Sequence, residues 1–260
     1  MSDSGFPAPE KIRRVLVPLF LLGASLLAAC AALSSEPLLA DGETVNEGEK
    51  RGGFPVESLA ESNDCYDIRI AYPFFGRPDA DQALRRRVEA LLLSTADEFL
   101  ALCRESPKAR RPENAFSADY ALFGTPQTIS VVFSGYTDSG GAHGLTEMES
   151  LTWLVSGGEK LDYADIFARA DGLWEFLADY ARGALRPELE EIWLAAPEFA
   201  AGLDPVEASF RVFALTPEGL SLFFPPYQTA PHAYGTQRCD VPLEDLLRFV
   251  PRPGIWQAAP

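Results

Sequence analysis

FSADYALFGTPQTISVVFSGY, residues 116–136, contains two apolar runs separated by a turn signal. Residues 124–127 combine glycine and proline, as tight turns commonly do. After the turn, Ile129, Val131 and Phe133 occupy alternate positions, which is the period of a strand with one buried face. We therefore predict two antiparallel strands, one on each side of the turn.

The flanking sequence predicts further strands and helices around this hairpin. A strand at 65–75 precedes a helix that begins near Asp79 or Asp81 and runs to about residue 105 with one apolar side. The other expected elements are a strand from the Gly-rich corner to about 155, helices at 172–186 and 188–199 broken by Pro187, a hairpin of 209–215 with 220–224, a strand at 236–241 and a helix at 243–249. Strands joined by tight turns, with helices inserted in groups, predict an α+β fold with mainly antiparallel sheets and packed helices.

The first 30 residues resemble an export signal. Three basic residues precede an uncharged apolar run, 15–29, that ends in Leu27-Ala28-Ala29-Cys30. This order is that of a secretory signal peptide, and the last four residues resemble the lipobox of bacterial lipoproteins, whose cysteine is acylated. The alternative is an uncleaved spanning helix over 15–33. Both interpretations place the remaining chain outside the cytoplasm.

We predict cleavage before Cys30 and a membrane anchor formed by lipid on that cysteine. Ala31 is not the aspartate that usually retains such proteins at the inner membrane. If the source has two membranes, this favours the outer membrane, with the domain facing the periplasm. Residues 31–60 are small, acidic and Gly-rich, so residues 30–60 are predicted to form a flexible tether.

The charge of the chain limits the choice of partners. Its formal net charge is −16, and it becomes −17 without residues 1–29, which hold three basic and two acidic residues. Such a surface repels nucleic acid and attracts cationic partners. A general role in solubility explains the same charge.

Cysteine spacing predicts one disulfide bond in an oxidising compartment. Cys65 opens the early strand, and Cys103 lies near the end of the helix that follows. A strand and a helix joined by a short turn run roughly antiparallel, so the start of the strand meets the end of the helix. We predict a Cys65–Cys103 disulfide and a buried thiol at Cys239.

Two motifs resemble a known family. Residues 136–144, Tyr136-Thr-Asp-Ser-Gly140-Gly141-Ala-His143-Gly, are similar to the tyrosine plus Gly-Gly-Ala-His segment of the RsiV-type extracellular domain. Residues 219–235 resemble its apolar strand followed by tyrosine, Ala-Pro-Tyr and glycine, except that His232 replaces the usual tyrosine. This domain forms the outer part of an anti-sigma factor and also occurs beside peptidoglycan deacetylase domains.

The resemblance covers roughly residues 65–250 and implies an α+β fold of two associated subdomains. It implies lysozyme as the ligand in the anti-sigma factor, and no established catalytic activity for the domain itself. We expect a signal peptide at 1–29, a tether at 30–60, an N-terminal subdomain at 61–126, an RsiV-like C-terminal subdomain at 127–251 and a loose tail at 252–260.

His143 has two interpretations. A strand continuing from it would place His143, Glu147 and Glu149 on one face, where they could bind a metal or act as an acid–base set. The alternative is structural. Gly140, Gly141 and Gly144 would supply positive φ angles at a corner, and His143 would fix that corner by hydrogen bonding. With two histidines in the chain, a deacetylase metal site is excluded, and no Gly-x-Ser-x-Gly elbow is present.

The loop 225–235 holds Tyr227, His232 and Tyr234 between prolines. Exposed aromatic residues on a stiff loop suit protein or glycan recognition, whereas rings buried over the core would be structural. Together with Tyr136 and the glycine corner, these residues form the candidate binding motif.

We predict a non-catalytic envelope protein that needs no cofactor or metal and binds lysozyme, another cationic protein or a cell-wall component. The rival hypothesis is a peptidoglycan-acting enzyme or accessory factor that uses His143 with Glu147 or Glu149. A purely structural envelope component is a third possibility.

Overall fold

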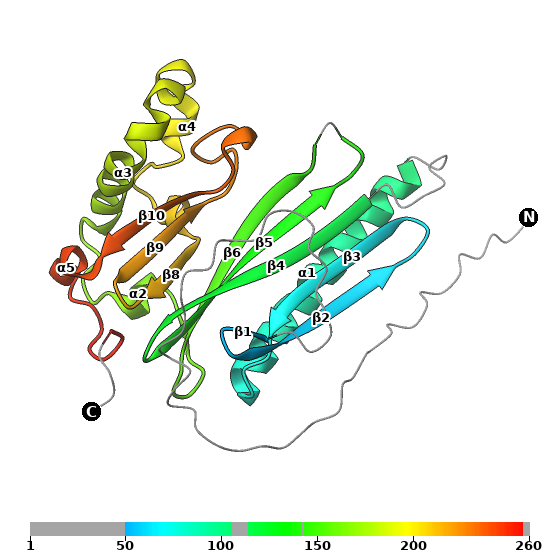
Figure 1. The fold of residues 1–260 in the computed structure, drawn as a ribbon, viewed down its shortest axis with the longest axis horizontal. Coiled ribbons are helices and arrows are strands. Elements are labelled where there is room, and N and C mark those ends of the chain that lie inside the picture. The colour runs from blue at the N-terminus through cyan, green and yellow to red at the C-terminus, as the bar shows by residue number, and fades with distance from the viewer. Residues whose placement is uncertain (1–49, 106–113, 142, 257–260) are drawn as a thin grey trace, which may run out of the picture.

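The computed structural model describes residues 50–105, 114–141 and 143–256, which form an α+β fold with two sheets (Figure 1). The predicted signal peptide and Cys30 lie outside the described residues. The larger sheet has seven strands in sequential order: β1 (Lys50–Arg51), β2 (Phe54–Ser62), β3 (Tyr66–Pro73), β4 (Asn114–Thr125), β5 (Thr128–Asp138), β6 (Leu145–Leu154) and β7 (Lys160–Leu161). All pairs are antiparallel except β3 with β4, which α1 (Pro78–Glu105) connects as a crossover.

The central hairpin forms as its sequence predicts. β4 and β5 pair from Ala115 with Asp138 to Thr125 with Thr128. Val131 and its alternate neighbours face the core beneath α1, while Val132 points to the opposite face. The strand period therefore gives this sheet two buried faces.

Helix α1 covers one face of the seven-stranded sheet. The carboxylate of Asp81 fixes the entry to the helix by accepting hydrogen bonds from the backbone N–H groups of Phe75 at 2.7 Å and Arg77 at 2.6 Å. Leu84 and Val88 on the sheet-facing side are fully buried. Burial of this apolar side holds the helix on the sheet.

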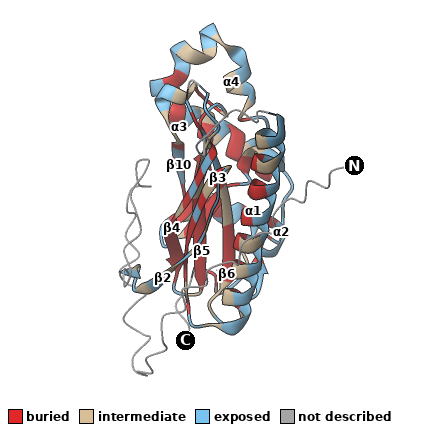
Figure 2. Cartoon of the chain, turned by 90° about the vertical axis from the view of Figure 1, so that its right-hand side faces the viewer, coloured by how far each residue is buried: buried red, intermediate tan, exposed pale blue. Residues whose placement is uncertain are grey.

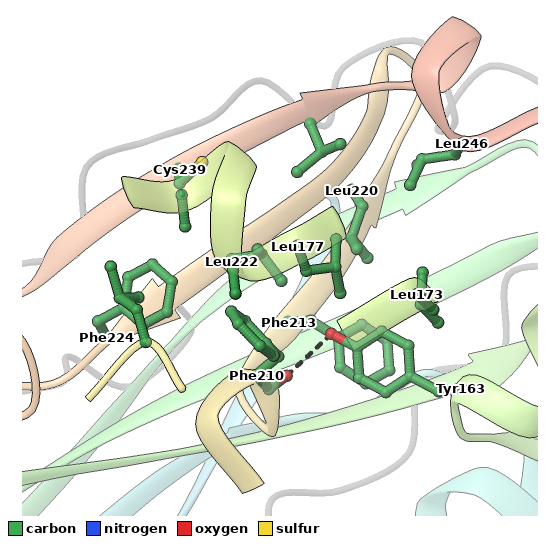
Figure 3. Packing of buried hydrophobic residues seen from close by; sticks show 14 of the residues in the cluster. Tyr163, Leu173, Leu177, Phe210, Phe213, Leu220, Leu222, Phe224, Cys239 and Leu246 are labelled. Carbon is green, nitrogen blue, oxygen red and sulfur yellow. Dashed lines mark hydrogen bonds between the residues drawn. The ribbon is translucent and has the colours of Figure 1, made fainter. Parts of the chain in front are cut away.

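The smaller sheet contains β8 (Phe213–Thr216), β9 (Gly219–Phe224) and β10 (Gln237–Pro242), with β9 in the middle. The long helix α3 (Leu173–Ala195) packs on one face of it, and shorter helices complete this half: α2 (Tyr163–Ile166), α4 (Pro197–Ala201), η2 (Glu207–Phe210), η3 (His232–Tyr234), α5 (Leu243–Leu246) and η4 (Leu247–Phe249). In the core that they share, the hydroxyl of Tyr163 donates a hydrogen bond of 2.8 Å to the carbonyl oxygen of Phe210 (Figure 3).

The two sheets pack face to face, so the layers run α1, large sheet, small sheet, α3. Val132 and Met148 of the large sheet contact Ala214 and Phe223 of the small sheet. Ser130 lies between them, and its hydroxyl oxygen accepts a hydrogen bond of 3.1 Å from the N–H of Leu215. Figure 2 shows buried residues concentrated on the strands between the helical layers.

Three predicted boundaries are wrong. Residues 50–60 belong to β1 and β2 rather than to a tether, because the Gly52-Gly53 turn, with φ of 55° and 84°, folds β2 back along β1. The predicted boundary at 126/127 falls inside the β4–β5 hairpin, so the change from the large to the small sheet comes after β7 instead. The described part of the C-terminal segment, 252–256, is not loose.

That C-terminal segment is held by apolar burial and hydrogen bonds. Ile255 is buried, and its carbonyl oxygen accepts a hydrogen bond from the hydroxyl of Thr125. The indole N–H of Trp256 donates to the carbonyl oxygen of Thr216 at 2.9 Å. The segment therefore links β4 of the large sheet to β8 of the small sheet.

The predicted break at Pro187 is also wrong. Helix α3 runs through Pro187 without interruption. Leu185 and Leu189 on either side of it are both buried, so tertiary packing outweighs the loss of one helical hydrogen bond.

The predicted disulfide is confirmed. Cys65 and Cys103 are bonded, with their Cα atoms 5.9 Å apart, because β3 and α1 run as the sequence predicts. Cys239 carries a free thiol that is 3% exposed within β10. Among the described helices, none has the length and apolar character needed to span a membrane.

Candidate functional site

The two family-like motifs meet in space. The ring of His143, from the corner between β5 and β6, lies against the loop 225–235, and its Nε2 is 3.0 Å from the hydroxyl oxygen of Tyr227, 84 residues away in the sequence. The Nδ1 atom of His143 lies 3.0 Å from the carbonyl oxygen of Gly144. A carbonyl can only accept, so Nδ1 carries a proton, and with a neutral imidazole the Tyr227 hydroxyl donates to Nε2.

Three rings form the centre of this site. His143 stacks on His232 with ring centroids 4.8 Å apart and an interplanar angle of 23°. Tyr227 lies 6.1 Å from His143 and 5.8 Å from His232. We call these three residues the aromatic cluster. His232, where the resembled motif usually has tyrosine, contributes a ring to this cluster.

The glycine corner positions His143. The N–H of Gly144 donates a hydrogen bond of 3.2 Å to the hydroxyl oxygen of Tyr136. A Cβ atom on Gly144 would lie 2.3 Å from the Tyr136 ring, so close approach requires glycine there. Gly140 has a φ of 80°, as predicted, but Gly141 and Gly144 do not have positive φ, so that part of the prediction is wrong.

Tyr227 is held in a conformation that is rare for a bulky residue. Its φ is 70°, a region that few non-glycine residues occupy and that often marks a functional site. Its N–H donates to the carbonyl oxygen of Ala230 at 2.9 Å, which closes the turn. The fold therefore holds this side chain outward at some conformational cost.

The neighbouring residue, Gln228, anchors the loop. Its Nε2 atom donates hydrogen bonds to the carbonyl oxygens of Gly202 at 2.9 Å and Ser209 at 2.8 Å. The indole of Trp193 donates to the carbonyl oxygen of Thr229 at 2.9 Å. These anchors come from the helical tip, residues 188–209, which comprises the end of α3, α4 and η2 and lies beside the loop in Figure 1.

The rings of the loop are accessible rather than folded over the core. Tyr227 is 43% exposed and Tyr234 is 46% exposed, and His143 is exposed as well. Tyr234 makes no described ring contact with the cluster, and its carbonyl oxygen accepts a hydrogen bond of 2.7 Å from Gln237. The exposed rings favour recognition over the structural alternative for Tyr227 and Tyr234.

The predicted combination of His143 with Glu147 or Glu149 is not assembled. Glu149 lies opposite Phe133 in the sheet and therefore faces α1, where its carboxylate forms an ion pair with Arg87 at 2.6 Å. Glu147 points to the same face, two residues earlier. His143 instead precedes β6 and turns toward the loop. Within the described residues, no three His, Cys, Asp or Glu side chains are grouped to hold a metal ion.

The helical tip that braces the loop is acidic. Glu191, Glu198 and Glu207 are exposed and form no ion pair with a described residue. Two of the basic residues nearby are engaged, since Arg182 pairs with Asp204 at 3.4 Å and Arg186 pairs with Glu190 at 3.1 Å. The surface beside the aromatic cluster thus carries excess negative charge.

Sequence reasoning identified the members of the cluster but missed their anchors. Gly202 and Trp193 lie 26 and 36 residues before their partners in the loop, and no local pattern connects them. Gln228 lies within residues 219–235, which resemble the family motif, but nothing in its neighbours indicates that its side chain anchors the loop.

One family model matches part of this chain, and solved structures are similar to it. Residues 164–244 match the model of a family described as "Protein of unknown function (DUF3298)". A solved DUF3298 family protein from Pseudomonas aeruginosa is similar with a TM-score of 0.51 and 20% identity, covering 78% of this chain and 96% of that one. Another, from Bacteroides fragilis, has a TM-score of 0.47, 15% identity and coverages of 75% and 93%.

Two curated proteins are similar to this chain over most of its length. The chain is 25% identical over 210 residues to the peptidoglycan-N-acetylmuramic acid deacetylase PdaC of Bacillus subtilis, covering 78% of this chain but only 44% of that protein. It is 29% identical over 191 residues to the immunogenic protein MPT64 of Mycobacterium tuberculosis, covering 70% and 76%. The chain therefore carries a DUF3298 match within an α+β fold, and the more specific likeness to the RsiV-type domain stays a prediction.

Gly202→Ala is expected to lower the free energy of unfolding by roughly 1–3 kcal/mol, the usual cost of overpacking. A Cβ atom at Gly202 would lie 1.9 Å from the carbonyl oxygen of Gln228, so the loop backbone would have to move away. Chemical denaturation measures the change.

Gly183→Ala is the matched control. Nothing lies within 4 Å of a Cβ atom at Gly183 in α3, and alanine is the better helix former, so a gain of roughly 0.5–1 kcal/mol is expected. Equal stabilities for the Gly202 variant and the wild type would contradict the tight docking of the loop on the helical tip.

Proposed function

We propose that this chain is an exported, lipid-anchored protein of the cell envelope whose folded domain binds a cationic protein without catalysing a reaction. Lysozyme is the partner to test first, because the resemblance implies it. The observation that carries the proposal is the aromatic cluster, exposed on a strained loop and bordered by the acidic helical tip. Anchoring through Cys30 follows from the lipobox and is part of the proposal.

The surface has the two components that protein recognition uses. Exposed tyrosine rings on a rigid loop supply contact area at low entropic cost, and such residues often dominate binding energy. The unpaired carboxylates of the helical tip supply attraction that accelerates association and weakens with salt. A cationic protein complements both.

The chemistry of the cluster favours binding over catalysis. Both nitrogen atoms of His143 are engaged, one by a backbone carbonyl and the other by the Tyr227 hydroxyl. Within the described residues no serine or cysteine side chain forms a hydrogen bond with this imidazole. The enzymatic rival would require turnover of cell-wall fragments that His143→Ala abolishes.

The test measures lysozyme binding to the full chain over a salt series. Tyr227→Asn removes the ring while keeping a residue that tolerates positive φ, and binding is expected to weaken by about tenfold or more, as for a hot-spot residue. Replacing Glu191, Glu198 and Glu207 by glutamine is expected to slow association and flatten the salt dependence.

Leu247→Ala is the control, because Leu247 is 60% exposed and follows α5 at the far end of β10 from the loop. It should leave affinity unchanged. Absence of saturable lysozyme binding at low ionic strength would refute the lysozyme proposal, and equal losses for Leu247→Ala and Tyr227→Asn would refute the assignment of the surface.

A further inference from the structure

The outward face of α1 has an unusual pattern. Helix α1 spans 28 residues, about 42 Å. Opposite its buried side, positions spaced alternately by three and four residues form one continuous line along the helix. These seam positions are Ala83, Arg86, Ala90, Leu93, Asp97 and Leu100. These positions are exposed in the middle of the helix, where Leu93 is 59% exposed. Spacing of this kind is the seam by which two helices pack against each other.

The charges on this seam lack partners. Arg86 and Asp97 are exposed and make no ion pair with any described residue. Their neighbours do: Arg85 pairs with Glu89 at 3.0 Å, and Arg87 pairs with the carboxylate of β6 described above. The helix thus pairs Arg85 and Arg87 beside the seam and leaves Arg86 and Asp97, on its middle turns, without an ion pair to a described residue.

We propose that this face binds the same face of a second copy of the chain, with the two α1 helices antiparallel. When Arg86 is placed opposite Asp97 of a second copy, the two-fold axis passes between positions 91 and 92. The same register places Asp97 opposite Arg86 of that copy, so both charges are paired twice. Two-fold symmetry requires such self-complementarity.

The apolar seam positions agree with that register. Leu93 falls opposite Ala90 of the second copy, and Ala90 falls opposite its Leu93, which places each large side chain against a small one on either side of the axis. Further out, Ala83 falls opposite Leu100. The pairing of Arg86 with Asp97 alone set the register, and the apolar pairs follow from it without further adjustment. Leu93, which is exposed, faces Ala90, and a large side chain against a small one allows close packing of helices.

The competing arrangements are less favourable. A parallel, in-register pair would place Arg86 against Arg86 and Asp97 against Asp97, and like charges that face each other are destabilising.

The size of the interface sets its strength. One helix face buries less than a standard interface of about 800 Å² per partner. The proposed dimer is therefore antiparallel and weak enough to depend on protein concentration.

Charge exchange tests the register directly. Arg86→Asp makes every Arg86–Asp97 contact repulsive, and Asp97→Arg does the same with opposite sign. Two attractive pairs become repulsive, so each single variant should dissociate about 30-fold more readily than the wild type. The masses are measured by sedimentation over a concentration series, with the full chain in detergent so that an attached lipid does not hold copies together.

A mixture of the two variants gives the decisive result. In the heterodimer, residue 86 of each copy again faces an opposite charge at residue 97 of the other, so mixing two dissociated variants should restore dimers. Arg169→Asp, which makes the same charge change at an exposed site off the helix, should leave self-association unchanged. A wild-type chain that is monomeric at all concentrations, single variants that dimerise normally, or a mixture that stays monomeric would each overturn the proposal.

Discussion

Replacing Cys65 and Cys103 together by serine is expected to lower the free energy of unfolding by about 4 kcal/mol. The bond joins residues 38 positions apart, and closing a loop of that length removes conformational entropy of about this size from the unfolded chain. The loop contains α1 as far as Cys103, so the cross-link fixes the C-terminal end of the helix to the start of β3. Urea denaturation of both proteins measures the difference.

Reducing agent provides the matched control for this prediction. Dithiothreitol should lower the stability of the wild type to that of the double variant and leave the double variant unchanged. The prediction fails if the two oxidised proteins differ by less than about 1 kcal/mol, since surface serines alone change stability by no more than about half of that.

Raising the pH from 9 to 12 is expected to destabilise the wild type by up to about 4 kcal/mol through Cys239. Burial, with a smaller contribution from the charge of Asp240, raises the pKa of the thiol from 9.0 to about 12. The folded pKa lies above the unfolded one, so the stabilising effect of the protonated thiol is complete below pH 9 and is lost as the pH rises to 12. Three pKa units correspond to about 4 kcal/mol.

Cys239→Ala isolates this effect. The variant lacks the thiol, and its stability should fall less over the same pH range. The remaining decline includes Tyr66, whose pKa is raised to about 12 by burial and by its hydrogen bond to Glu61, and which both proteins share. Parallel pH profiles for the two proteins would show that the thiol of Cys239 does not titrate as proposed.

Short-range patterns predicted most of the fold. The alternation at Ile129, Val131 and Phe133 located β5, and the acidic residues at 79 and 81 located the start of α1. The expectation that β3 and α1 run antiparallel predicted the disulfide between Cys65 and Cys103. Each of these features depends on residues close in sequence or on one short connection.

The errors arose where tertiary contacts decide the structure. In β2 the larger apolar side chains, Phe54, Val56 and Leu59, do not keep a period of two, and the strand is held by pairing with β3. The Gly52-Gly53 turn was the available signal, because paired glycines favour tight hairpins. Pro187 misled for a related reason, since packing of the flanking leucines keeps α3 continuous.

The candidate site was predictable in its members and not in its assembly. His143 and Tyr227 were singled out in separate motifs, but neither motif indicates that the two side chains form a hydrogen bond. That contact depends on how the two sheets dock, which involves Val132 and Phe223. Packing of this kind leaves no local trace in sequence.

Because His143 comes from the large sheet and Tyr227 from a loop of the small sheet, the proposed recognition surface exists only where the two sheets are docked. Neither proteolytic half should retain affinity, even where its own secondary structure persists. A partner that binds both His143 and Tyr227 would stabilise the docking of the two sheets. Saturation with that partner should therefore raise the melting temperature of both halves together. Calorimetry of the saturated complex would then show a single cooperative transition.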